Sequence, residues 1–472
     1  MAVKILMPAL SPTMESGKIA QWLVAENEAV TSGDILAEIE TDKAIVELEA
    51  IDDGVVGKIL FEAGPDQIDV NQPIAVLLLD GEDERAADVL MQQDDAPVPE
   101  TSLAPAPEVE PAEPQERQNS QPPKQAQTIL PVEVSLPADT PHREIPMREA
   151  LRDALAEEMR RDGDVFIMGE EVAEYEGAYK VTQGLLAEFG GRRVIDTPIT
   201  EHAIAGLGIG AAFSGLKPVV EFMTFNFAMQ AIDQIVNSAA KTRYMSGGQI
   251  SCPIVFRGPN GVASRVAAQH SQDYSSWYAH VPGLIVLTPA NAAEAKGLLK
   301  AAIRDPNPVV FLEHELLYGE QGQVPDYDDF VLPIGQARIA RAGNDVTLVA
   351  YARGVAMALQ AAEQLAAIGL EAEVIDLRSL RPLDVDTVVA SVEKTNRLVT
   401  IEEGWPICSV GSEIAAQVQR RAFDALDAPI EAVNGADVPM PYAENLERLA
   451  LPQIDQIVAA AKRAAYFRDA AE

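Results

Sequence analysis

A proline-rich segment divides this chain of 472 residues into parts that must fold separately. Residues 97–141 contain 11 prolines in 45 positions, and no aromatic residue occurs between Phe61 and Phe166. Such a stretch of Pro, Ala, Glu and Gln cannot bury enough apolar surface to fold. Because it has proline without glycine, we predict an extended, semi-stiff linker over residues 82–141. A plain disordered connection and a tether for a moving domain fit this composition equally well.

Acidic residues outnumber basic ones throughout the chain, and the formal net charge is −37. Residues 1–81 carry −11 and residues 82–141 carry −10, which leaves −16 for the remaining 331 residues. The phosphates of nucleic acid would be repelled by such a chain, and an anionic membrane surface is equally unfavourable. We therefore expect neither nucleic acid nor a membrane as a partner.

The sequence favours a bacterial cytosolic protein. Its beginning lacks the basic and apolar pattern of an export signal. The longest uncharged apolar stretch near the middle, residues 203–216, is too short for a bilayer, which takes about 20 residues. Two cysteines, Cys252 and Cys408, cannot form a disulfide framework, so a reducing compartment is expected.

The first 81 residues have the pattern of a small all-β unit. Apolar and polar residues alternate in short runs such as 21–24 and 35–39, and Gly, Asp and Asn separate the runs. The tripeptide Gly-Lys-Ile occurs at 17–19 and again at 57–59, an offset of 40. We predict two similar half-sheets that pack face to face over a shared core.

Lys43 lies midway between the two halves, within Glu-Thr-Asp-Lys-Ala at residues 40–44. A lone surface lysine is usually only a solvated charge. However, the first 81 residues resemble lipoyl domains: residues 40–44 match the lipoylation motif, and residues 6–14 match the family's N-terminal strand. Biotin carriers share this flattened-barrel fold but place methionine on both sides of the lysine, whereas Asp42 and Ala44 stand here. The resemblance implies covalent lipoate on Lys43, at the exposed tip of a hairpin.

After the linker the pattern changes to alternating helices and strands. Met147, Leu151, Leu155 and Met159 recur every four residues and predict one face of a helix. Buried strands are predicted at residues 165–168, 219–220, 254–256, 284–287 and 309–312. Helical stretches such as 293–303 separate them, which is typical of a mainly parallel sheet with helices on both faces.

A second α/β series begins around Pro333, and its strands are predicted at 346–350, 372–375 and 398–401. We place the domain boundary near residue 325. The predicted domains are 1–81, 142–325 and 326–472, with the linker over 82–141.

Five motifs in the α/β region carry a family resemblance. They are DTPITE at 196–201, EFMTFNF at 221–227, AAQHSQ at 267–272, DLRSLRP at 376–382 and EEGWP at 402–406. Residues 144–460 closely resemble the beta subunits of the decarboxylating component of 2-oxo acid dehydrogenases. This implies a transketolase-like pyrimidine-binding domain and a transketolase C-terminal domain.

The segment GADVPMPYA at 435–443 is similar to the pyruvate-specific branch of that family. The resemblance implies oxidative decarboxylation of pyruvate with thiamine diphosphate and reductive acetylation of lipoyl groups, which feeds acetyl-CoA synthesis. Two alternatives stay open: a branched-chain 2-oxo acid or acetoin dehydrogenase beta subunit, and a non-catalytic lipoyl carrier or docking scaffold.

Glu201 is the first candidate catalytic residue. Apolar neighbours, Ile199, Ala203 and Ile204, would desolvate its carboxyl group and favour the protonated form. Thr200 followed by Glu201 is also an ordinary helix start. The resemblance makes Glu201 the cofactor glutamate, which hydrogen-bonds the aminopyrimidine ring of thiamine diphosphate.

Four further positions match site residues of the family. Ile199 and Phe227 correspond to residues that line the aminopyrimidine ring, although a core role is the default for either. Glu170 ends a predicted strand, where α/β proteins bind ligands, and the family uses it in an acidic path between paired active sites. A solvated loop carboxylate is the simpler reading. His270 is the one histidine of five in a family motif, and an imidazole suits proton transfer to the opening dithiolane sulfur.

A metal site is implied only by the resemblance. The matching residues are Ile254, Ala302, Ile303, Asp305 and Asn307, whose counterparts hold a structural potassium ion in some relatives. Hard oxygen ligands suit such a cation. The sequence Asp-Pro-Asn-Pro at 305–308 is also simply a good turn.

The sequence contains no Gly-Asp-Gly, the start of the family's motif for the divalent metal that holds the pyrophosphate. The resemblance therefore implies a separate alpha subunit that supplies Mg²⁺, the pyrophosphate contacts and part of the substrate pocket. It also implies a heterotetramer of two alpha and two beta subunits. Further partners would be a dihydrolipoyl acyltransferase core and dihydrolipoyl dehydrogenase.

Overall fold

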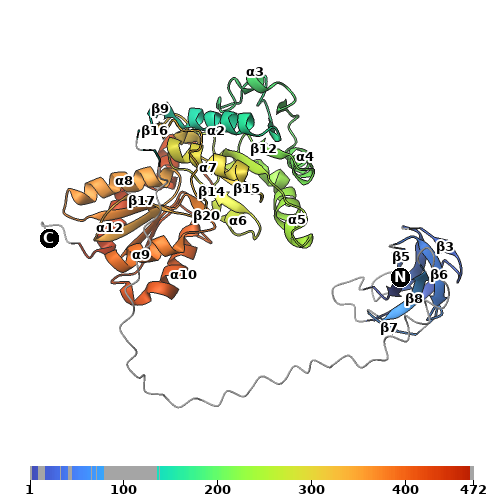
Figure 1. Ribbon diagram of the computed structural model, residues 1–472. Helices are drawn as coiled ribbons and strands as arrows, with labels where there is room; N and C mark the ends of the chain where they lie inside the picture. Colours follow the sequence, from blue (N-terminus) through green and yellow to red (C-terminus); the bar gives the residue numbers. More distant parts are fainter. Residues whose placement is uncertain are drawn as a thin grey trace, which may run out of the picture. The chain divides into compact units, whose positions relative to one another are not determined.

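The computed structural model divides into two units, Met1–Pro122 and Pro123–Glu472, and each is described by itself (Figure 1). Within the described residues, no helix is long and apolar enough to cross a bilayer. The structure describes residues 3–8, 16–31, 33–40, 45–50, 52–64, 66–70, 72–78, 136–137 and 139–467.

The first unit is built from two four-stranded antiparallel sheets, which confirms the predicted all-β fold. One sheet has the spatial order β1 (Val3–Leu6), β8 (Pro73–Leu78), β6 (Gly54–Ile59) and β3 (Ala29–Val30). The other has the order β5 (Ile45–Glu49), β4 (Ile35–Glu40), β2 (Ser16–Trp22) and β7 (Ile68–Asp69). The two copies of the repeat lie in β2 and β6, one in each sheet. Ile19 and Ile39 of one sheet pack with Ile74 of the other, so the sheets share a core.

Strands β4 and β5 flank the predicted lipoylation motif. They pair antiparallel, and Glu40 lies opposite Ile45 at the end of the pair. Lys43 itself lies outside the described residues, as do residues 79–135 of the chain. The hairpin tip and the linker therefore stay predictions.

The second unit opens with β9 (His142–Pro146) and α2 (Met147–Arg161). The four apolar residues that predicted this helix are all buried, and they form part of one core with β10 and α7. β9 pairs antiparallel with β16 (Gln321–Pro325). The remaining helices of this half are α3 (Leu185–Phe189), α4 (Glu201–Phe213), α5 (Ala240–Met245), α6 (Ser275–Ala279) and α7 (Ala292–Arg304).

A seven-stranded sheet organises this half of the unit. Its order is β11 (Val194–Asp196), β10 (Val165–Gly169), β12 (Lys217–Glu221), β13 (Val255–Pro259), β15 (Val309–Glu313), β14 (Ile285–Leu287) and β20 (Ser379–Arg381). The first six strands pair in parallel, as predicted. The last, β20, pairs antiparallel with β14 although it comes from the second α/β series. The two series are thus joined through one sheet.

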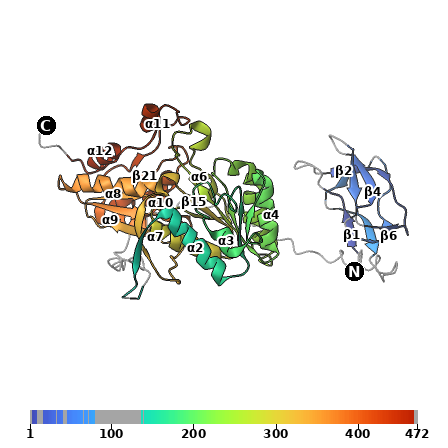
Figure 2. The same ribbon diagram turned by 90° about the horizontal axis from the view of Figure 1, so that it is seen from above.

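The second series forms a five-stranded sheet. Its order is β17 (Arg338–Arg341), β19 (Ala372–Asp376), β18 (Val346–Ala350), β21 (Leu398–Ile401) and β22 (Glu431–Val433), and only β17 runs antiparallel to its neighbour. Helix α8 (Arg353–Ala366) packs against α12 (Ile454–Ala464), and α9 (Val385–Thr395) packs against α10 (Val410–Ala422) (Figures 1 and 2). Helix α11 spans Glu444–Ala450.

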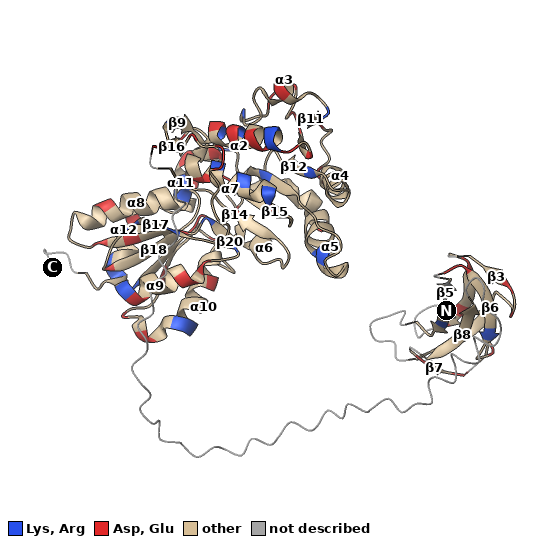
Figure 3. Ribbon diagram, viewed as in Figure 1, with Lys and Arg blue, Asp and Glu red and all other residues tan. Residues whose placement is uncertain are grey.

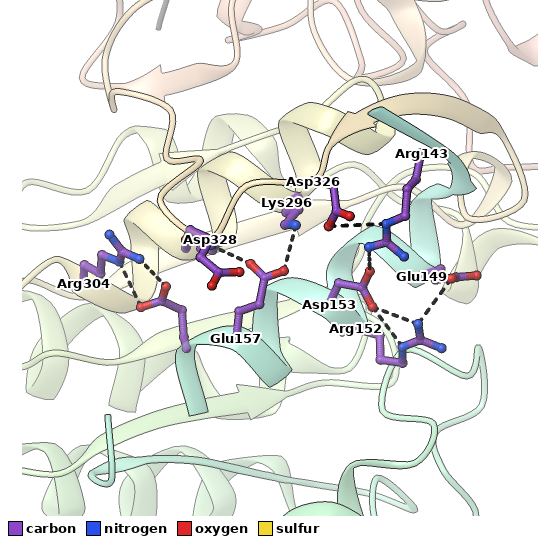
Figure 4. Close-up of polar contacts among 11 residues, drawn as sticks. Arg143, Glu149, Arg152, Asp153, Glu157, Lys296, Arg304, Asp326 and Asp328 are labelled. Atoms are coloured by element: carbon purple, nitrogen blue, oxygen red, sulfur yellow. Dashed lines mark hydrogen bonds and ion pairs between the residues drawn. The ribbon is translucent and has the colours of Figure 1, made fainter. Parts of the chain in front are cut away.

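Helices α2 and α7 are joined by a row of ion pairs (Figure 4), and charges of both signs line α2 (Figure 3). The side chains of Lys296 and Lys300 are fully buried, and both pair with Glu157, at 2.8 and 2.6 Å. Lys300 also donates to the backbone oxygen of Asp328. A buried cation is tolerated only where oxygen atoms compensate its charge. One carboxylate therefore serves two buried ammonium groups.

We expect Glu157→Gln to lower the free energy of unfolding by about 3–5 kcal/mol, because it leaves two buried lysines without a counter-charge. Urea unfolding of the full chain measures the effect. The matched control is Glu149→Gln on the same helix. Glu149 pairs with Arg152 at 3.3 Å on the surface, so its loss should cost less than about 1 kcal/mol. Equal effects of the two variants would contradict the assignment.

Candidate active site

The candidate residues follow neighbouring parallel strands. Glu170 follows β10, Phe227 follows β12 and His270 follows β13. Glu201 begins α4, directly after the segment that leaves β11. Parallel strands end at the same edge of a sheet, and α/β proteins bind ligands at that edge.

Two carboxyl groups lie close together here. Glu201 is only 6% exposed although it begins a helix. Glu170 is half-buried, and its pKa is raised above the usual range, first by burial and then by the negative charges of Glu201 and Glu171. Within the described part of the chain, Thr200 makes no side-chain capping hydrogen bond. Burial of a carboxyl group at a helix start is unusual, and the electrostatic effect of Glu201 on Glu170 indicates that the two carboxyl groups are neighbours.

The two apolar residues of the predicted site are not fully buried core residues. Ile199 is 80% exposed, which argues against the default core role. Phe227 is half-buried, and its ring meets that of His270 edge-on, with centroids 4.9 Å apart. An exposed aliphatic side chain two residues from a buried carboxyl group, and an aromatic ring that meets an imidazole, suit a flat, nitrogen-containing ring. The residues present are therefore compatible with an aminopyrimidine.

His270 is exposed and lies in a short helical turn, Ala268–His270, within the loop after β13. The backbone N–H of Gly261 donates to the carbonyl oxygen of Gln272 at 2.9 Å and closes the loop at its base. The side chain of Asn226, next to Phe227, accepts from the Gln272 N–H at 3.0 Å. These contacts bring Phe227 and His270 together from two separate loops.

His202, to which the sequence assigns no role, is exposed on the first turn of α4. Its Nε2 lies 3.4 Å from the amide nitrogen of Gln234.

The sequence did not predict a buried charged cluster on β12, β13 and β15 of the same sheet. Arg257 is 1% exposed, and its guanidinium binds Glu221 and Glu313, which joins the ends of β12, β13 and β15. Tyr318 donates to Glu313 at 2.6 Å. Burial raises the pKa of Glu221, although the charge of Arg257 opposes the shift. The sequence did contain one sign of this cluster: Arg257 directly follows the apolar run 254–256. A charged residue inside a buried strand needs partners of opposite charge.

The five predicted potassium ligands lie just before the start of β13 and around the C-terminal end of α7. The side-chain oxygen of Asp305 accepts from the backbone and side-chain nitrogens of Asn307, both at 2.8 Å. The Ile254 carbonyl accepts from the Val309 N–H at 2.9 Å, and Ala302 accepts from Asp305. These bonds form a turn, and a cation there stays a prediction. In the described ranges, no group of three or more His, Cys, Asp or Glu is arranged to hold a metal ion.

Family models match most of the chain. They are "Transketolase, pyrimidine binding domain" over residues 143–321, "Transketolase, C-terminal domain" over 335–457, and "Biotin-requiring enzyme" over 3–77. A solved structure described as a split gene transketolase, inactive beta4 tetramer, is similar with a TM-score of 0.57 at 25% identity. It covers 69% of this chain and 100% of that chain.

Curated relatives give a narrower result. "Pyruvate dehydrogenase E1 component subunit beta" of Rhizobium meliloti is 60% identical over 466 residues, which is 99% of this chain and 100% of the relative. The protein of the same name from Rickettsia felis is 62% identical over 324 residues, 69% of this chain and 99% of the relative. The first of these spans nearly the whole chain, the N-terminal domain included. The chain belongs to the family of pyruvate dehydrogenase E1 component beta subunits, with a lipoyl-type domain at its N-terminus.

Proposed function

We propose that this chain is the beta half of a thiamine-diphosphate-dependent enzyme that decarboxylates pyruvate and acetylates lipoyl groups. Two observations support the proposal: buried Glu201 acts electrostatically on half-buried Glu170, and Phe227 contacts His270. All four residues follow strands of one parallel sheet, on the side where α/β proteins bind ligands. The high identity to pyruvate dehydrogenase beta subunits favours pyruvate over branched-chain 2-oxo acids or acetoin. A non-catalytic scaffold would have no need for this pair of carboxyl groups.

When bound, thiamine diphosphate supplies the carbanion chemistry of decarboxylation. Glu201 would donate a hydrogen bond to the aminopyrimidine nitrogen, and Ile199 and Phe227 would pack against the ring. Glu170 would hold or pass on a proton, because burial and its acidic neighbours favour its protonated form.

His270 would act in the second half-reaction. When the disulfide of a lipoyl group opens, one sulfur leaves as a thiolate and needs a proton. The exposed imidazole of His270 could donate it, and the edge contact with Phe227 holds the ring beside the site. Lipoate on Lys43 would be one acceptor of the acetyl group.

We also propose that this chain works with other proteins of a multienzyme complex. An alpha subunit would bring the Mg²⁺ motif that this sequence lacks and would complete a heterotetramer of two alpha and two beta subunits. An acyltransferase core and dihydrolipoyl dehydrogenase would take over the acetyl group and the electrons. We place the assembly in the bacterial cytosol.

We expect the isolated chain to bind thiamine diphosphate weakly, because half of the site would be missing. Titration calorimetry with Mg²⁺ should show tight binding only after the alpha subunit is added. The assembled complex should then turn over pyruvate faster than branched-chain 2-oxo acids or acetoin. Tight Mg²⁺-dependent binding by this chain alone would contradict the two-subunit model.

A further inference from the structure

We propose that Glu403, which lies in the C-terminal domain, is a positioning residue for His270. It holds the base of the loop that carries His270 and so sets where the imidazole stands. The inference rests on the proposed role of His270 in acetyl transfer to lipoyl groups. It adds a contribution of the C-terminal domain to that half-reaction.

The loop over residues 261–272 lies between β13 and α6, and its two ends meet. Gly261 and Gln272 are joined by a backbone hydrogen bond of 2.9 Å. Asn260, just before the loop, donates its backbone N–H to Glu313 and accepts the Tyr274 N–H at its side-chain oxygen, both at 2.8 Å. These hydrogen bonds fix the base of the loop. A side chain that contacts the base therefore influences where the rest of the loop lies.

Glu403 touches that base from the other domain. Its side chain is 8% exposed, and Oε2 accepts from the Val262 N–H at 3.3 Å and lies 3.0 Å from His314 Nε2. Oε1 pairs with Arg353. Burial alone would raise the pKa of Glu403, but His314 and Arg353 together lower it to about 2. His314 and Arg353 thus favour the charged carboxylate and hold it in place.

Gly261 shows how closely the loop sits on this group. A Cβ atom at Gly261 would lie 2.9 Å from Glu403 Oε2 and 3.2 Å from His314 Nε2, and its φ is +84°. The cavity lined by these residues and Arg353 has a volume of about 10 Å³, room for one water at most. The contact is therefore packed too tightly for a ligand, and its role is support.

The rest of the loop has little support in the described structure. Ser264, Arg265 and Val266 are exposed, and Arg265 reaches the C-terminal domain only through a surface pair with Glu444 at 3.0 Å. Arg265 and Ala267 have φ values of 56° and 63°. Such backbone persists only where the surroundings hold it. The Glu403 contact with Val262 supports this segment from the side of the C-terminal domain, and Asn226 holds its other end at Gln272.

The test uses Glu403→Gln in the full chain, assembled with its alpha partner. Decarboxylation is followed with an artificial electron acceptor, and acetylation is followed on a free lipoyl domain. We expect acetylation to fall about 10- to 100-fold, because a small displacement of a catalytic group has effects of that order. Decarboxylation should stay within about twofold. The control is Glu444→Gln, which removes a surface contact of the same loop and should change neither rate by more than about twofold.

A double-mutant cycle separates positioning from general damage. If Glu403 acts through His270, then Glu403→Gln should have no further effect on acetylation in a His270→Ala background. Losses that multiply would overturn the proposal. So would an equal fall of decarboxylation and acetylation in the single variant.

A structural readout keeps this inference apart from the proposed function. Hydrogen exchange over residues 262–270 should speed up in Glu403→Gln and not in His270→Ala. If exchange is unchanged, the anchor is refuted. If exchange speeds up but His270→Ala acetylates normally, the role of His270 fails and this inference fails with it. Should Glu403→Gln not fold, Gly261→Ala displaces the same contact without removing a charge, and the same results are expected of it.

Discussion

Replacing Glu201 by glutamine is expected to reduce pyruvate decarboxylation by at least about 10²-fold, the range in which a positioned acid or base contributes. Glutamine has almost the same shape as glutamic acid, so the first turn of α4 should keep its packing. The amide cannot hold and return the proton that the carboxyl group exchanges with the ring nitrogen. The loss should therefore appear in activity while assembly with the alpha subunit is preserved.

The measurement needs two readouts on the same preparation. Size-exclusion chromatography reports assembly, and decarboxylation with an artificial acceptor reports cofactor activation. The matched control is Glu174→Gln, a neutralised carboxyl group on the exposed part of the loop after β10, which should leave both unchanged. Near-normal decarboxylation by the Glu201 variant would refute its assignment as the cofactor glutamate.

The elements of the fold that could be predicted from the sequence are those whose signal is local. The helix from Met147 to Arg161 was visible because its buried face repeats every four residues within one segment. The central strands of both sheets, such as β13 and β18, were visible as short apolar runs, whereas the outer strands β11, β17 and β22 were not predicted. Strand β20 was not predicted either, because Ser379, Leu380 and Arg381 form no apolar run. It pairs with β14, which belongs to the other α/β series, so its partner is not visible in the local sequence.

The same distinction applies to the site. Glu201, Phe227 and His270 lie in motifs that a family resemblance can locate. The charged residues that support these loops could not be paired from the sequence, because the partners are far apart. His314 and Glu403, for example, are separated by 89 residues. The partners Arg257 and Glu313 are 56 residues apart. One sequence does not indicate which buried charges meet, because any of its many carboxylates could pair with any arginine or lysine.

Lys43→Arg should abolish acetyl loading of this chain and leave decarboxylation with an artificial acceptor intact. Arginine keeps the positive charge but cannot form the amide bond to lipoate. Intact-mass analysis of protein from its native cell should show one lipoyl group on the unchanged chain. After addition of pyruvate and the alpha subunit, it should also show an acetyl group. The variant should show neither.

Lys18→Arg is the matched control, because Lys18 lies on β2 of the same domain and should leave lipoylation unaffected. The predicted linker would give the domain its reach, because about 60 residues at roughly 3 Å each would extend well beyond one subunit. Tethering would also raise the local concentration of the lipoyl group to the order of millimolar. An acetyl group could then pass to a neighbouring active site or to the acyltransferase core.

Native protein that is never modified at Lys43, or an arginine variant that still becomes acetylated on this domain, would refute the carrier role. The domain would then be a docking module with a lipoyl fold.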